Sequence, residues 1–129
     1  MRRVLVDTNV LLSALVFPHG TAARAFWRVV NEDSLVLTEV ILHEAEDVVG
    51  RKWPHLLDVL AEFVQALSFD LLSAAATSVE IRDPGDQSIL DAAIACAVDV
   101  ILTGDKDFLA LGLDRPLVLT PRDFLDLRD

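Results

Sequence analysis

Short, continuously apolar segments recur along the chain, and longer segments with helical periodicity lie between them. The apolar segments are residues 4–6, 35–37, 100–103 and 117–119. Strands this uniformly apolar are covered on both faces, and their alternation with helices is typical of a parallel sheet. The sequence therefore predicts the α/β class, with helices on both faces of the sheet.

The segments between the predicted strands carry helix signals: apolar residues at a 3.6-residue period, capping residues and prolines at helix starts. Thr21 is expected to cap the second helix, and Gly50 is expected to close the third. The predicted helices span residues 8–17, 22–30, 39–49, 54–67, 86–98 and 106–111, with a last one begun by Thr120 and Pro121. Residues 31–33 and 83–85 are expected to form turns. The segment 68–82 is least regular, with a helix at 72–77 and a strand at 79–81 as its expected elements.

The 129 residues fit one compact domain spanning residues 1–129, because the chain contains no linker-like segment. Apolar residues make up 53% of the chain, which excludes intrinsic disorder. No run approaches the ~18 apolar residues of a membrane span, and Asp7 interrupts the first apolar run too early for a signal peptide. We therefore expect a cytoplasmic protein that does not bind membranes.

The charge balance restricts how the protein could meet a polyanion. The chain has 11 basic and 21 acidic residues, a net charge of −10. Residues 1–57 carry six basic and seven acidic side chains, and residues 58–129 carry five and fourteen. The charge therefore argues against binding of nucleic acid mainly by phosphate neutralisation, and a polyanion would have to approach the first half.

Two acidic side chains directly follow predicted strands. Asp7 follows residues 4–6, and Asp105 follows the strand at 100–103 after one glycine. Carboxyl ends of parallel strands meet at one edge of a sheet, so these carboxylates are expected to be neighbours. The structural alternatives are a helix cap for Asp7 and an ordinary turn for Asp105.

A third acid lies inside an apolar helix stripe. Glu44 is three residues after Ile41 and four before Val48, on the face that also carries Ala45. A carboxylate there requires a cation or several donors, because an unpaired buried charge costs several kcal/mol. The alternative is a glutamate that reaches water from the edge of the stripe.

Asp86 repeats this pattern at the head of the predicted helix 86–98. It shares a face with Leu90, Ala93 and Ala97, whereas Asp91 points about 140° away. Asp86 is therefore favoured over Asp91 as a functional acid. The alternative is a purely stabilising role at a helix N-terminus.

Four converging carboxylates would repel one another, by ~4 kcal/mol per pair at 4 Å and an effective dielectric of 20. Such a cluster raises its own pKa values or binds cations. Cys96 is the single cysteine, and the three histidines show no ligand spacing, which disfavours zinc. Oxygen ligands of this kind select Mg²⁺ or Mn²⁺.

The motifs are together similar to those of a known family. They are Val-Leu-Val-Asp-Thr-Asn-Val-Leu-Leu-Ser-Ala-Leu at 4–15, Thr-Glu-Val-Ile-Leu-His-Glu-Ala at 38–45, Asp-Gln-Ser-Ile-Leu at 86–90, Leu-Thr-Gly-Asp-Lys-Asp-Phe at 102–108 and Leu-Thr-Pro at 119–121. This set resembles the PIN-domain family, particularly its bacterial VapC-type toxins. The resemblance runs from about residue 3 to residue 125 and is most specific at Asp-Thr-Asn and Thr-Gly-Asp.

The resemblance implies a compact α/β/α sandwich around a short, mostly parallel sheet, and metal-dependent hydrolysis of RNA by an acidic cluster. It assigns catalysis and metal binding to Asp7, Glu44, Asp86 and Asp105, although a stricter count places Gln87 at the third position. Asp91 and Asp107 are candidates for supporting roles around those ligands, and Asn9 and Thr103 for hydrogen bonds that steady Asp7 and Asp105. The implied products are a 5′-phosphate and a 3′-hydroxyl.

Other side chains are candidates for substrate contacts. Arg24 and Arg28 lie four residues apart and could hold the RNA backbone, the alternative being a solvated pair. We expect Phe26, Trp27 and Trp53 in the core or at a dimer contact, with base stacking as the alternative.

The resemblance also implies partners: a second copy in a homodimer, and a small antitoxin that blocks the acidic site. Two other functions share features with the sequence. A receiver-like Mg²⁺-binding signalling domain has the same class and size, but it needs adjacent acids after the first strand, where this chain has Asp7, Thr8 and Asn9. A phosphatase of the Asp-x-Asp type is disfavoured because Asn9 replaces the second acid.

Overall fold

A five-stranded sheet forms the centre of the molecule in the computed structural model, which describes residues 1–72 and 84–127. The strands are β1 (Arg3–Val6), β2 (Ser34–Thr38), β3 (Asp70–Leu72), β4 (Val100–Leu102) and β5 (Leu117–Leu119). Their order is β3-β2-β1-β4-β5, and every pairing is parallel. Leu5 pairs with Val36 on one side and Ile101 on the other, and all three are fully buried. The predicted α/β class and parallel sheet are confirmed.

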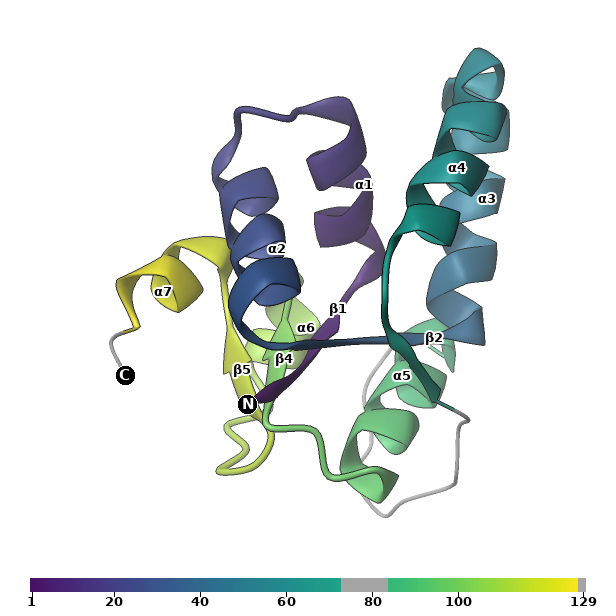
Figure 1. The fold of residues 1–129 in the computed structure, drawn as a ribbon. Coiled ribbons are helices and arrows are strands. Elements are labelled where there is room, and N and C mark those ends of the chain that lie inside the picture. The colour runs from purple at the N-terminus through teal and green to yellow at the C-terminus, as the bar shows by residue number, and fades with distance from the viewer. Residues whose placement is uncertain (73–83, 128–129) are drawn as a thin grey trace.

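Helices cover both faces of this sheet. The connections on one face contain α1 (Thr8–Val16), α2 (Thr21–Glu32), α3 (Glu39–Lys52), the 3₁₀ turn η1 (Pro54–Leu56) and α4 (Leu57–Ala66). The later helices are α5 (Pro84–Ala95), α6 (Lys106–Leu109) and α7 (Pro121–Asp126). Right-handed crossovers place α1 to α4 on one face, and the turn back across the sheet from β3 to β4 places α5 on the other. Figure 1 shows α1 to α4 above the sheet and α5 below it.

Hydroxyl and carboxylate caps start several of the helices. Thr38 Oγ1 accepts a hydrogen bond from the Ile41 amide at 3.1 Å at the start of α3, and Thr120 Oγ1 accepts one from Asp123 at 3.1 Å at the start of α7. Thr21 does not have the predicted capping role: Gly20 is the N-cap of α2, and Thr21 is its first residue.

Gly50 does not close α3, as the sequence suggested. The helix continues through Gly50 to Lys52, and Trp53 is its C-cap. A Cβ at Gly50 would meet nothing within 4 Å, so the glycine is an interior residue on an open helix surface. Tertiary packing of α3 outweighs the intrinsic cost of a helical glycine, which is only about 0.5–1 kcal/mol.

Other element boundaries also differ from the predictions. The expected turn at 31–33 is wrong because α2 runs through Glu32, and the segment 54–67 is divided into η1 and α4. Leu72 ends a strand, and the rest of the helix predicted at 72–77 and the strand at 79–81 lie outside the described residues. Pro84 already begins α5, and this helix ends at Ala95 rather than residue 98.

The interior is closed by aromatic packing between α2 and α4. Phe26 is fully buried, its ring stacks on Phe63 with centroids 5.7 Å apart, and Trp27 meets both rings edge-on. Trp27 keeps 39% exposure, so it borders this core rather than filling it. No helix in the described part of the chain is long and apolar enough to cross a bilayer.

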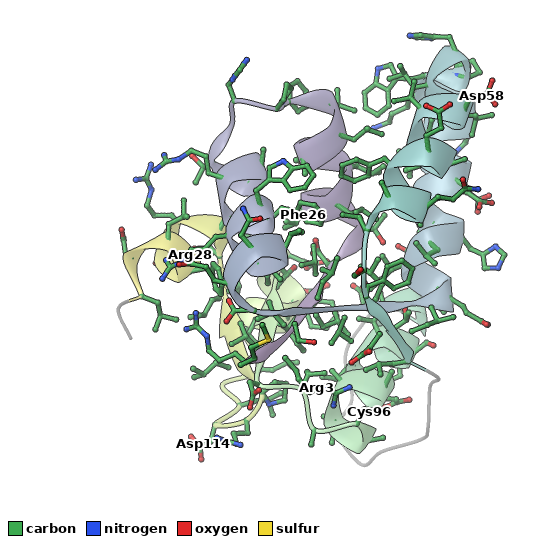
Figure 2. All side chains as sticks on the ribbon, in the orientation of Figure 1. Arg3, Phe26, Arg28, Asp58, Cys96 and Asp114 are labelled. Atoms are coloured by element: carbon green, nitrogen blue, oxygen red, sulfur yellow. The ribbon has the colours of Figure 1, made fainter. Side chains whose placement is uncertain are left out.

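Arg28 joins α2 to the C-terminal end of α7 (Figure 2). Its guanidinium donates to the carbonyl oxygens of Phe124, Leu125 and Leu127 at 3.0–3.1 Å. It also lies over the Phe124 ring, 5.4 Å from the centroid, and bonds Glu32 at 3.0 Å. Arg28 therefore links α2 to the last carbonyl groups of α7, among them that of Phe124, which also accepts the Leu127 amide.

Candidate active site at the carboxyl edge of the sheet

The carboxyl ends of β1 and β4 lie at the switch point of the sheet. The chain leaves β1 toward β2 on one side and later returns to form β4 on the other. Ligand sites of open α/β sheets form in the crevice beyond such a point. Asp7 follows β1 and Asp105 follows β4 across this point, as their sequence positions predicted.

Asp7 is buried and anchored by both carboxylate oxygens. Oδ1 accepts a 2.9 Å hydrogen bond from the Val10 amide, so Asp7 is the N-cap of α1. Oδ2 accepts a hydrogen bond from the Thr103 hydroxyl. The capping role is therefore real, and it also fixes the direction of the carboxylate.

Thr103 connects the two acids that follow strands. It is fully buried between β4 and Asp105, and its own amide donates to the Leu119 carbonyl of β5 at 2.9 Å. Its hydroxyl donates to Asp7 and accepts the Asp105 amide at 2.9 Å. Thr103 thus bonds both Asp7 and the backbone of Asp105, and its supporting role in a functional site stays a prediction.

Glu44 approaches the same edge from α3. Its Oε2 accepts a 3.0 Å hydrogen bond from the hydroxyl of Thr8, the first residue of α1, and Thr8 is 6% exposed. Glu44 itself is half-buried, beside the buried Ile41 and Ala45. Thr8 was not among the predicted site residues; its one signal in the sequence is a hydroxyl directly after Asp7, the acid that follows β1.

The negative charges of Asp105 and Glu44 act on the Asp7 carboxylate. Burial is the largest cause that raises the pKa of Asp7 above its usual value, and the negative charges of Asp105 and Glu44 raise it further. The hydrogen bonds from Thr103 and Val10 oppose that rise without cancelling it. We call Asp7, Glu44 and Asp105 the acidic edge.

The third predicted ligand lies on α5. Asp86 is half-buried in the first turn of that helix, whose buried stripe includes Leu90 and Ala93. Ala97 is not part of the stripe, since it lies beyond the helix end, is exposed and has a φ of 52°. Gln87 donates from Nε2 to Asp91 Oδ1 at 2.9 Å, and α5 contacts α3, which carries Glu44. The choice among the three polar residues stays a prediction.

The remaining predicted residues occupy distinct places. The amide of Asp107 donates to Asp105 Oδ1 at 2.8 Å and shapes the loop after β4. Asn9 is exposed and lines a hollow between α1 and α3. Arg24 is exposed on α2, and Arg28 is engaged by α7. Contact of either arginine with RNA stays a prediction.

The chemistry of the acidic edge fits a hard divalent cation, because its donors are carboxylate oxygens. Within residues 1–72 and 84–127, no three His, Cys, Asp or Glu side chains lie close enough to bind one ion together. Both oxygens of Asp7 accept protein hydrogen bonds, and Glu44 and Asp105 each accept one. Metal binding would therefore require the carboxylates to move toward one another.

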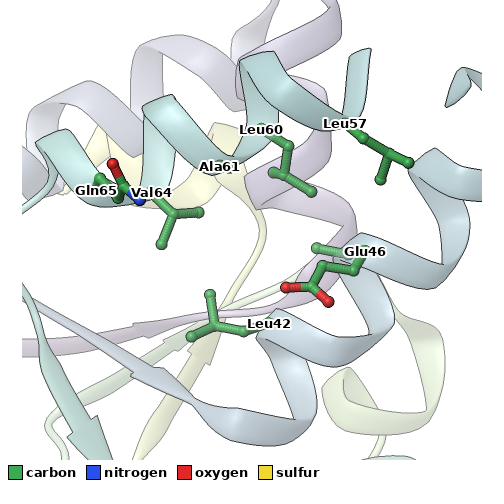
Figure 3. A pocket seen from close by; sticks show the side chains of 8 residues that line it. Leu42, Glu46, Leu57, Leu60, Ala61, Val64 and Gln65 are labelled. Carbon is green, nitrogen blue, oxygen red and sulfur yellow. The ribbon is translucent and has the colours of Figure 1, made fainter. Parts of the chain in front are cut away.

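A second concave surface, between α3 and α4, has a different character (Figure 3). It has a volume of about 300 Å³ and is lined mainly by aliphatic side chains, among them Leu42, Leu60 and Val64, with Glu46 and Gln65 also present. It lacks the convergent acids of the acidic edge, so we do not assign the reaction to it.

The strand order separates this fold from the receiver alternative. Receiver-type sheets of the flavodoxin kind have the order 2-1-3-4-5, whereas the order here is 3-2-1-4-5. The receiver-like signalling function therefore has no support from the topology.

Comparisons with known proteins agree with this arrangement. The model of the PIN domain family matches residues 3–107. No curated protein sequence matches the chain. The fold resembles VapBC2 from Rickettsia felis, solved bound to a DNA fragment from its promoter, with a TM-score of 0.70, 12% identity and coverage of 92% of this chain and 98% of that one.

A second solved structure with this fold is VapC20 of Mycobacterium tuberculosis, a toxin that cleaves the sarcin-ricin loop. Its TM-score is 0.64, with 16% identity and coverage of 85% of this chain and 95% of that one. At these identities the likeness concerns the fold. The match of the family model over most of the sequence, on a parallel sheet with acids at its switch point, shows that this chain belongs to the PIN domain family.

Proposed function

We propose that the protein is a Mg²⁺- or Mn²⁺-dependent ribonuclease that hydrolyses phosphodiester bonds of RNA. The observation that carries the proposal is the buried Asp7 carboxylate, whose pKa is raised by burial and by two neighbouring acids in a PIN-domain fold. A carboxylate in this state is stabilised by a nearby cation, and perturbed acids in a cleft are typical of functional sites.

In this proposal Asp7, Glu44, Asp86 and Asp105 hold the cation. The chemistry supplied by a bound divalent ion is a lowered pKa of water and neutralisation of the charge on the scissile phosphate and leaving oxygen. The protein's own contribution is orientation. Thr103 and the Val10 amide fix Asp7, and Thr8 directs Glu44.

Substrate approach has to overcome the acidic charge of the protein. The excess of acids is concentrated in residues 58–129, and the first half of the chain is nearly balanced. Arg24, which is exposed on α2, is available for a phosphate contact. We expect Arg28 to contribute less, because α7 already binds its guanidinium.

We further propose that this ribonuclease is the toxin of a toxin–antitoxin pair, acts in the cytoplasm, forms a homodimer and is inhibited by a small antitoxin. The support is the fold shared with VapBC2 and with VapC20. Which RNA it cleaves is a separate question from the fold, because function is determined by the site.

Cleavage of purified RNA in Mg²⁺, in Mn²⁺ and in EDTA tests this proposal. We expect cleavage only with a divalent ion, and none by Asp7→Asn with an unchanged circular dichroism spectrum. Equal cleavage by both proteins would refute the proposal. If cleavage is observed as expected, anomalous diffraction from crystals soaked in Mn²⁺ would identify the metal ligands and decide among Asp86, Gln87 and Asp91.

A further inference from the structure

A hollow between α1 and α3 begins beside the acidic edge. Its wall includes Asn9, Ser13 and Phe17 from α1 and its C-cap, and Lys52 and Trp53 from the end of α3. We call it the α1–α3 hollow. Asn9, at one end of the hollow, directly follows Thr8, the residue that bonds Glu44, so this end lies one residue along α1 from a contact of the acidic edge.

The hollow has room for part of a substrate rather than for a whole small molecule. Its volume is about 170 Å³, below the ~300 Å³ at which pockets for separate small ligands begin. From Asn9 to Phe17 the helix rises by about 12 Å at 1.5 Å per residue. Figure 1 shows α1 and α3 rising side by side from the same edge of the sheet. A polymer bound at the acidic edge could therefore extend along the two helices.

The side chains of the hollow have the chemistry of a single-strand binding surface. Phe17 is 61% exposed, and Trp53 is half-buried against the core. The exposed Lys52 places its ammonium over the Trp53 ring, 5.8 Å from the centre, so a base that stacks on this face displaces the ammonium toward the adjoining phosphate. Aromatic faces that stack unpaired bases, with a cation for the backbone, characterise single-stranded RNA sites.

We propose that the α1–α3 hollow binds an unstacked base of the RNA, next to the scissile phosphate, with Trp53 as the stacking surface. Lys52 contacts the adjoining backbone, and Asn9 hydrogen-bonds the edge of the base. The position of the hollow follows from the structure, and its occupant rests on the proposed ribonuclease function. This assignment selects the base-stacking alternative for Trp53 and gives Asn9 a substrate role instead of a bond to Asp7.

Photo-crosslinking tests the location directly. The Asp7→Asn variant, which should leave RNA intact, is irradiated with single-stranded RNA containing 5-iodouridine, and crosslinked peptides are mapped by mass spectrometry. We expect crosslinks at Trp53 or Phe17. Crosslinks confined to Trp27, which is exposed on α2 outside the hollow, or no crosslink at all, would overturn the proposal.

Cleavage kinetics of the active protein provide the second test. Trp53→Leu and Lys52→Ala should raise KM for single-stranded RNA with little change in kcat, by about 5- to 150-fold for the stacking residue. The matched controls are Trp27→Leu and Arg51→Ala, because both residues are exposed and neither lines the hollow. Asn9→Ala should change the preference among oligonucleotides with a different base next to the cleavage site.

The two proposals fail in different ways. If Trp53→Leu cleaves RNA with an unchanged KM, the proposed ribonuclease function stands and the proposed base-binding role of the α1–α3 hollow is wrong. Crosslinks at Trp53 without any cleavage by the native protein would keep an RNA contact and overturn the ribonuclease. If Trp53→Leu instead weakens self-association in gel filtration and leaves RNA kinetics unchanged, the hollow serves a protein contact and our assignment is wrong.

Discussion

Replacing Asp7 with asparagine is expected to stabilise the fold while it abolishes cleavage. Asp7 is 6% exposed, and its burial, together with the charges of Asp105 and Glu44, raises its pKa. A raised carboxylate pKa means that the folded protein holds this negative charge at a cost in free energy at neutral pH. Removing the charge removes that cost.

Asparagine preserves most of the local hydrogen bonding. Its Oδ1 can accept the Val10 amide, now 2.9 Å from Asp7 Oδ1, and asparagine caps helices as well as aspartate does. Its Nδ2 would donate to the Thr103 hydroxyl oxygen, which has two lone pairs, while the Thr103 hydroxyl hydrogen loses its carboxylate acceptor, a cost that offsets part of the gain. We expect Asp7→Asn to raise the unfolding free energy by about 0.5–2 kcal/mol. Gains of this size are typical when a residue that function retains at a cost in stability is replaced. At 129 residues this corresponds to a rise in Tm of about 2–8 °C.

The difference between the two proteins should depend on pH in one direction. The folded-state pKa of Asp7 lies above the unfolded value of 3.8, so native protein binds this proton more tightly. The Asp7 charge therefore lowers the unfolding free energy of the native protein most at pH values above the folded-state pKa. This loss disappears as the pH falls toward 3.8. The advantage of Asp7→Asn should be full at pH 7 and shrink on acidification.

Urea unfolding of both proteins at pH 7 and pH 4.5, in EDTA, measures these differences. Addition of Mn²⁺ at 100 times its Kd should stabilise the native protein by about 2.7 kcal/mol and the variant much less. An asparagine variant that is less stable than the native protein at pH 7 in EDTA would refute our reasoning about the buried charge.

Three further substitutions test separate features. Thr8→Val should weaken Mn²⁺ binding by roughly 10- to 100-fold in calorimetry, because the Glu44 carboxylate loses its 3.0 Å hydrogen-bond donor. Thr8→Ser keeps the hydroxyl and should bind Mn²⁺ as the native protein does. Equal Mn²⁺ affinities of Thr8→Val and the native protein would exclude a positioning role for Thr8. Gly50→Ala should raise the unfolding free energy by about 0.5–1 kcal/mol, and a lower Tm would contradict an interior helical position. Arg28→Ala should lower the unfolding free energy measured in urea by about 1–3 kcal/mol, because its hydrogen bonds to α7 are lost. Arg24→Ala is the control: Arg24 is exposed, and its replacement should change the unfolding free energy by less than about 0.5 kcal/mol.

The centre of the sheet was predictable because β1, β2 and β4 are buried on both faces. Burial of β1, β2 and β4 produces uninterrupted apolar runs, and the strand at 35–37 was identified to within one residue at each end. The strand at 117–119 was also identified from its apolar run, although Leu117 is 45% exposed. Helix ends were less predictable. Gly50 carries a strong stop signal locally, but α3 packs against α1, α4 and α5, and these contacts outweigh the signal.

The candidate site was predictable where it depends on strand ends. Asp7 and Asp105 follow apolar runs, and parallel strands bring their ends together regardless of distance along the chain. The bond from Thr8 to Glu44 was not predictable, since it joins residues 36 positions apart through the approach of two helices. Arg28 was expected near RNA for its charge, but the carbonyl groups at the end of α7 bind it, and only tertiary structure reveals them.

Thr103 carries one hydroxyl hydrogen, which is committed to Asp7, while its oxygen receives the Asp105 amide. A single side chain thus links the Asp7 carboxylate to the backbone of Asp105, across the ends of two strands. A chain that exchanged this threonine for valine would retain every acidic group and the same shape, yet its acids would no longer be held in register with each other. When members of this family are compared, the residue at position 103 is therefore as informative about activity as the acidic residues are.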